Sequence, residues 1–183
     1  MIVFWVLAAA GLDVNIAGQE IAEFDKCIEL SREGPWGMRL TQQKRSLALV
    51  VEGRLKSVER EIAAVLPVQS SGYKKRGTRP PPKLTDDPNP RLVEHARALL
   101  TFMQTVRNSG ERLGFGSTWN KASEAVQIRL GTYVEDLIDR LHEREEGDNP
   151  LRIRNYLDIA AEFLGLASDE KAAQIVRRRA DAA

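Results

Sequence analysis

Two long segments of this chain place apolar residues three or four positions apart, and this spacing constrains the fold more than any other feature. The first segment covers residues 41–66 and the second covers residues 117–141. Such spacing puts the apolar side chains on one face of an α-helix. Strand patterns are nearly absent. The chain is therefore expected to be all-α, with amphipathic helices that bury their apolar faces against one another.

A proline-rich stretch interrupts the helical pattern near the middle of the chain. Residues 67–90 hold six of the eight prolines, and proline is excluded from helix interiors because it lacks a backbone donor and fixes φ. We therefore expect an apolar start and a first helical hairpin in residues 1–66, an exposed basic linker in residues 67–90, and a second hairpin with a C-terminal helix pair in residues 91–183. The hairpins are expected to pack into one helical bundle.

Capping residues mark several helix ends. Asn89 and Asn149 each precede a proline, and this pair is typical of a helix start, with asparagine as the N-cap and proline in the first turn. Gly165 is expected to end the helix that follows Asn149. Ser168 or Asp169 is expected to cap the last helix.

A short pattern occurs twice. Residues 37–44 (GMRLTQQK) are echoed by residues 114–121 (GFGSTWNK), and each copy precedes a long amphipathic segment. The sequence therefore predicts an internal repeat, a glycine-rich corner followed by a helix that is capped by Thr41 in the first copy and by Ser117 or Thr118 in the second. Duplication and independent use of the same corner are both open explanations. The apolar residues expected to wedge the helices at the two corners are Trp36, Met38, Phe115 and Trp119.

Acidic and basic residues nearly balance, which restricts the choice of partner. The chain has 27 lysines and arginines against 26 aspartates and glutamates, so its formal net charge is +1. A global positive field is absent, and nucleic acid is not the expected partner. The single cysteine, Cys27, excludes an intramolecular disulfide and favours a reducing compartment. We therefore expect a cytoplasmic protein.

Motifs for catalysis and metal binding are missing from the sequence. The patterns H-E-x-x-H, C-x-x-C and D-x-D-x-D-G do not occur. The corner at residues 110–118 differs from a phosphate-binding loop because Gly116 stands where that loop needs lysine. His95 and His142 lie beside apolar stripe residues and are expected at the boundary of the core. We therefore expect no catalytic residue, cofactor or metal ion, and a protein that is not an enzyme.

The first residues of the chain are uniformly apolar. Residues 1–12 read MIVFWVLAAAGL, whereas a bilayer-spanning helix needs about 18 to 20 such residues. We interpret this run as a buried core helix. Two alternatives are a contact with a membrane or partner, and the end of a span that begins upstream. The residues assigned to the membrane or partner contact are Ile2, Phe4, Trp5 and Leu7.

Basic residues cluster in the proline-rich stretch and near the C-terminus. Such clusters bind phosphates or acidic surfaces electrostatically, although a solvated surface explains them as well. The residues assigned to anion contact are Lys74, Lys75, Arg76, Arg79, Arg177, Arg178 and Arg179.

Together these features favour a non-enzymatic helical module for protein–protein interaction or regulation. A protein partner or a second copy of the chain is expected, and membrane association through residues 1–12 is an added hypothesis. The alternative function is the binding of nucleic acid or another polyanion through the basic linker and the C-terminal arginines.

Overall fold

The computed structural model is helical over most of the residues it describes, and these residues form no β-sheet. The only pairing of extended segments within them is an isolated bridge between Val68 and Pro82. The all-α prediction is confirmed. The described residues are 13–21, 23, 34–69, 79–143 and 149–183.

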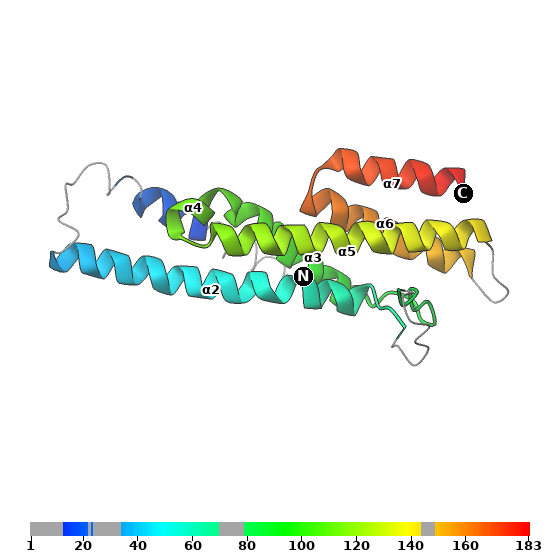
Figure 1. Cartoon of the computed structure of the whole chain (residues 1–183), viewed down its shortest axis with the longest axis horizontal. Coiled ribbons are helices and arrows are strands. Elements are labelled where there is room, and N and C mark those ends of the chain that lie inside the picture. Colours follow the sequence, from blue (N-terminus) through cyan, green and yellow to red (C-terminus); the bar gives the residue numbers. More distant parts are fainter. Residues whose placement is uncertain (1–12, 22, 24–33, 70–78, 144–148) are drawn as a thin grey trace.

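Five helices, each longer than two turns, account for most of the described residues from Gly34 onward. Figure 1 shows that the two longest, α2 and α5, lie lengthwise beside each other. A 3₁₀ turn and a very short helix connect α3 to α5. The bounds are α2 (Pro35–Val65), α3 (Pro90–Val106), the 3₁₀ turn η1 (Arg107–Ser109), α4 (Gly110–Leu113), α5 (Gly116–Glu143), α6 (Pro150–Ala167) and α7 (Glu170–Ala182).

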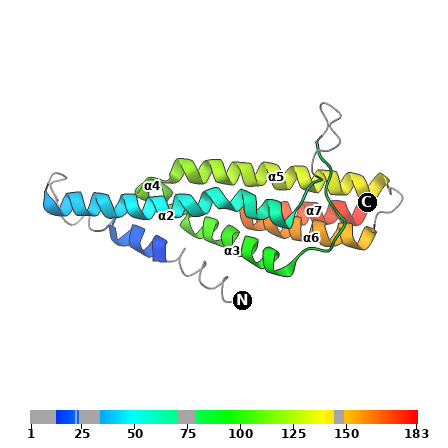
Figure 2. The same ribbon diagram turned by 90° about the horizontal axis from the view of Figure 1, so that it is seen from below.

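Helices α2, α3, α5 and α6 form a four-helix bundle. Both α2 and α6 pack against α3 and against α5, so α3 and α5 lie diagonally across the bundle (Figure 2). The second hairpin was expected to pair α3 with α5. In the structure, α5 packs along α6 instead. The connection through η1 and α4 gives the chain room to cross the bundle between α3 and α5. Helix α7 then packs mainly on α6.

One hydrophobic core extends through all four bundle helices. The apolar stripe expected on α2 is confirmed, because Val51, Leu55, Val58, Ile62 and Val65 are all buried. The proline-rich stretch joins α2 to α3, and these two helices pack against each other. The stretch therefore connects neighbouring helices of a single core.

Three of the expected N-caps are present, whereas Gly165, expected to end α6, lies inside that helix. The side chain of Asn89 accepts a hydrogen bond from the backbone N–H of Arg91 at 3.0 Å, and Asn149 accepts one from Leu151 at 3.1 Å. Asp169, one of the two candidates for the last helix, accepts from the N–H of Ala172 at 2.8 Å. These bonds satisfy backbone donors that have no partner within the first helical turn.

The internal repeat is not confirmed as a structural repeat. Helix α2 already begins at Pro35, and Thr41 lies inside it, where its hydroxyl donates to the carbonyl of Gly37 at 2.9 Å. Proline suits the first turn of a helix, so the chain becomes helical before the glycine that was expected to form a corner. The second copy does form a corner, with Gly114 in the left-handed conformation at φ 87°. Its helix α5 starts at Gly116.

Residues of the second copy act differently from the caps predicted for them. Ser117 and Thr118 lie inside the first turn of α5, and the Thr118 hydroxyl donates to a carboxylate oxygen of Glu52 on α2 at 3.2 Å. Phe115 is fully buried, as expected for a wedge. The indole N–H of Trp119 donates to the carbonyl of Met103 at 2.7 Å and so ties α5 to the end of α3.

The described parts of the proline-rich stretch are tied to the bundle. Lys83 donates its N–H to the carbonyl of Pro67 at 2.8 Å. Arg152 on α6 donates to the carbonyls of Leu84 and Thr85 at 3.0 and 2.8 Å. This stretch therefore makes specific contacts on both sides of residues 70–78.

Candidate functional site

The residues assigned from the sequence to a membrane or partner contact, Ile2, Phe4, Trp5 and Leu7, lie outside the described residues, and their role stays a prediction. The same holds for Lys74, Lys75 and Arg76 in the proline-rich stretch. Three of the assigned cations near the C-terminus and one in the proline-rich stretch are described, namely Arg177, Arg178, Arg179 and Arg79.

Two of the C-terminal arginines bind carboxylates of the same chain. Arg179 makes a two-pronged contact with Glu135 of α5, at 2.5 and 2.6 Å. This hydrogen bond holds the pKa of Glu135 below its ordinary value. Arg177 pairs with Glu170 at 3.2 Å. The contacts of Arg179 and Arg177 thus fasten α7 to α5 and to its own first turn. All three arginines are exposed.

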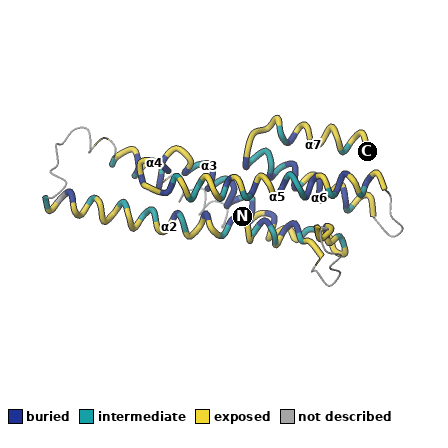
Figure 3. The backbone as a smooth tube through the Cα atoms, in the orientation of Figure 1, coloured by how far each residue is buried: buried dark blue, intermediate teal, exposed yellow. Residues whose placement is uncertain are grey.

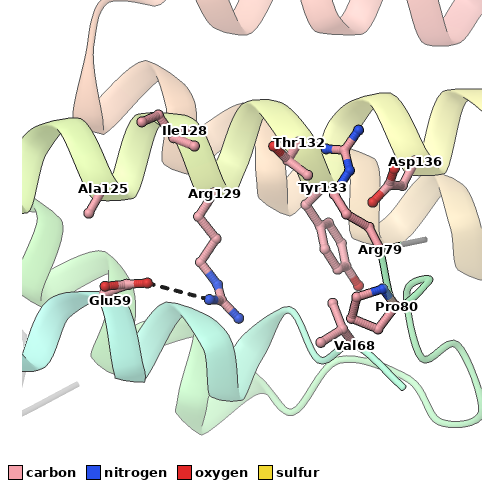
Figure 4. Close-up of a pocket in the computed structure, with 10 residues that line it drawn as sticks. All are labelled: Glu59, Val68, Arg79, Pro80, Ala125, Ile128, Arg129, Thr132, Tyr133 and Asp136. Atoms are coloured by element: carbon pink, nitrogen blue, oxygen red, sulfur yellow. Dashed lines mark ion pairs between the residues drawn. The ribbon is translucent and has the colours of Figure 1, made fainter. Parts of the chain in front are cut away.

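Arg79 lines an open groove of about 440 Å³ between α2, α5 and the proline-rich stretch (Figure 4). Tyr133 is buried at this groove, and its hydroxyl donates to the carbonyl of Pro67 at 3.4 Å. Ile128 and Val68 expose apolar surface there. The walls are mostly apolar, which suits the packing of an apolar group.

Opposite charges balance along this groove. Glu59 pairs with Arg129 at 3.6 Å. Burial raises the pKa of Asp136, and the nearby guanidinium of Arg79 acts in the opposite direction. With its cations and carboxylates offset in this way, the groove offers no net charge by which to select an ionic ligand.

The side of α2 that faces away from the bundle has a different character. We call it the outer face of α2. At 100° per residue most of its residues lie opposite the buried stripe, and Val50 lies at its edge. All of them are exposed, and exposed positions recur along the length of α2 (Figure 3). They are Met38, Gln42, Arg45, Ser46, Leu49, Val50, Gly53, Lys56 and Arg60.

Three apolar residues on the outer face of α2 are largely exposed. Leu49 is 69% exposed, Val50 is 66% exposed and Met38 is 59% exposed. Single exposed apolar residues are common on protein surfaces, whereas contiguous ones rimmed by polar residues are typical of contact sites. The core that contains Val51 and Leu55 is filled without them.

The three carboxylates of α2 lie on the flanks of the outer face. Glu52 accepts the hydrogen bond from Thr118, and Glu59 pairs with Arg129, so both point toward α5. Glu61 lies near His95 of α3, at 3.9 Å, and also accepts from Arg60 at 3.0 Å. The residues named for the outer face are thus cationic, polar or apolar, and the nearest carboxylates are those of Glu61, paired with Arg60, and Glu52, 4.0 Å from Lys56.

This face was not predicted from the sequence. The signal was present, because Leu49 and Val50 precede the stripe residue Val51 and fall outside the three-or-four spacing of the buried positions. Only the position of α2 relative to α3 and α5 shows that two of these three residues face solvent.

The described residues contain no group of three or more His, Cys, Asp or Glu side chains arranged to hold a metal ion. Within the same residues, no helix combines the length and the apolar character that crossing a bilayer requires.

Comparison of the chain with protein-family models, with curated proteins and with solved structures gave no match.

Proposed function

We propose that this protein is a helical interaction module that binds a protein partner through the outer face of α2. The observation that carries this proposal is the exposure of Leu49 and Val50 in the middle of a helix whose opposite side is fully used by the core. Burying these side chains against a partner is favourable, at roughly 25 cal/mol for each Å² of apolar surface removed from water.

The bundle presents this face on a stable support. Helix α2 packs against both α3 and α5, and the contacts of Glu52 and Glu59 with α5 fix its rotation about its own axis. A partner therefore meets side chains on a preorganised helix, which lowers the entropy lost on binding.

Site-specific photo-crosslinking tests the proposal. The full chain, with a photoreactive benzoylphenylalanine in place of Leu49, is expressed in its own host cells and irradiated. The matched control carries the same group in place of Leu151, which is 73% exposed on α6. We expect a discrete protein adduct at position 49 and a much weaker one at position 151. Equal adducts at both positions, or none at position 49, would contradict the proposal.

A further inference from the structure

From the charge and shape of the outer face of α2, we infer that its partner is an acidic amphipathic helix. This inference rests on the proposed function, because it assigns a chemical class to the partner of the same face.

The charge of the face is the first argument. The whole chain is almost neutral, with 27 basic and 26 acidic residues, whereas α2 carries six basic and three acidic ones. Of the cations on the outer face, Arg60 is paired with Glu61 at 3.0 Å, and Arg45 and Lys56 are exposed. Lys56 reaches Glu52 only at 4.0 Å and is 70% exposed. A partner surface with carboxylates therefore gains attraction here that a neutral or basic surface does not.

The shape of the face is the second argument. Gln42, Ser46, Leu49, Gly53 and Lys56 follow one another at alternating spacings of four and three residues. This is the spacing of a seam along which a second helix can lie.

Small residues leave room for a close approach along that seam. Ser46 and Gly53 lie about one helical turn before and after Leu49. A methyl group added at Gly53 meets no atom within 4 Å, apart from the backbone of its own helix turn. Leu49 thus projects between two positions with small side chains. Apolar side chains of a partner helix can pack into the space at these positions.

The arrangement fits a helix better than a membrane surface. A helix that lies in a bilayer interface has a continuous apolar face with its cations on the polar side. Here Gln42, Lys56 and Arg60 share the centre of the face with Leu49. It also fits a helix better than nucleic acid, since phosphate contacts give no role to exposed Leu49 and Val50.

Defined probes test the inference with the full chain. The first probe is a fluorescein-labelled heptad peptide with leucine at its a and d positions and glutamate at e and g, and the second has lysine in place of each glutamate. Vesicles of phosphatidylcholine and phosphatidylglycerol and a short DNA duplex are the other probes. We expect saturable anisotropy changes with the glutamate peptide, weaker at high salt, and no comparable binding of the others.

A charge-matched pair of variants assigns the binding to the face. The double variant Arg45→Glu with Lys56→Glu is expected to lower the affinity for the glutamate peptide by about tenfold or more, because two attractive contacts become repulsive. Arg154→Glu with Lys171→Glu changes the net charge equally at exposed positions on α6 and α7, and is expected to change the affinity by less than about threefold at physiological salt. Circular dichroism verifies that both variants fold.

Several outcomes overturn the inference. They are equal binding of the two peptides, an equal loss in both variants, no binding of the glutamate peptide, or binding of vesicles or DNA in its place. Self-association of the chain that Arg45→Glu with Lys56→Glu abolishes would assign the face to a second copy instead. If any of these occurs while position 49 still gives a specific crosslink, the interaction face stands and only the acidic helix is wrong. If the crosslink is also absent, the proposed function fails as well.

Discussion

Replacing Gly53 by alanine is expected to make the protein more stable. Glycine in a helix interior is about 0.5 to 1 kcal/mol less favourable than alanine, because the unfolded chain loses more freedom when it becomes helical. Gly53 lies inside α2, is exposed, and has open space around a new methyl group. No clash opposes the gain, so Gly53→Ala should raise the free energy of unfolding by about 0.5 to 1 kcal/mol.

Thermal and urea unfolding, followed by circular dichroism, measure this gain. For a chain of this size, 1 kcal/mol shifts Tm by about 2 to 4 °C, so the expected increase is about 1 to 4 °C. The urea midpoint should rise while the slope m stays constant. Gly114→Ala is the matched control, since φ is 87° there and an L-residue costs about 1 to 2 kcal/mol in that conformation.

The substitutions Gly53→Ala and Gly114→Ala are therefore expected to change Tm in opposite directions. A lower or unchanged Tm for Gly53→Ala, together with a lower Tm for Gly114→Ala, would refute the argument that the outer face is open at Gly53. The same variant also separates stability from binding. Its methyl group lies on the seam beside Leu49, so the glutamate peptide should bind Gly53→Ala more weakly even though the protein is more stable.

Three further predictions concern the core, the groove and the contact between α3 and α6. Phe115→Ala removes a fully buried ring and should lower the free energy of unfolding by about 3 to 5 kcal/mol in urea titrations; a loss below about 1 kcal/mol would contradict its role as a wedge. Burial raises the pKa of Asp136 above 3.8, so ionisation weakens the fold as pH rises through this range. Asp136→Asn should therefore raise Tm at pH 7, and a gain that persisted below pH 3.8 would contradict this cause. Arg97 binds both carboxylate oxygens of Glu162, one of them at 2.9 Å, and a double-mutant cycle with Arg97→Gln and Glu162→Gln should give a coupling of about 0.5 to 1 kcal/mol. A coupling of zero would contradict a stabilising role for this ion pair between α3 and α6.

Local chemistry explains which parts of the fold the sequence predicts well. The buried stripe of α2 follows from periodicity, because one face of an amphipathic helix must leave water wherever the helix packs. Asn89, Asn149 and Asp169 cap their helices through hydrogen bonds that span two or three residues. Each of these features depends on a short sequence window, so knowledge of the distant chain is not needed.

Features that depend on competing helix-start signals, or on contacts between residues far apart in the chain, were predicted poorly. Thr41 resembles a cap, but Pro35 starts α2 earlier and leaves Thr41 in the helix interior. The hydrogen bonds from Arg152 to Leu84 and Thr85 join residues far apart in the chain, and no pattern around either partner indicates the other. The diagonal placement of α3 and α5 also depends on how four stripes fit together, which periodicity alone does not determine.

The outer face of α2 shows why a candidate contact site needs the structure as well as the sequence. Periodicity identifies the buried side of a helix and leaves the opposite side as presumed solvent surface. Leu151 and Ile175 are exposed too, but each is a single apolar residue on its helix face and needs no special explanation. On α2, Leu49 has Val50 beside it, open space at Gly53 and two of the three carboxylates of the helix turned toward α5. A merely solvated face has no reason to combine these three properties, whereas a face that receives an acidic helix benefits from each of them.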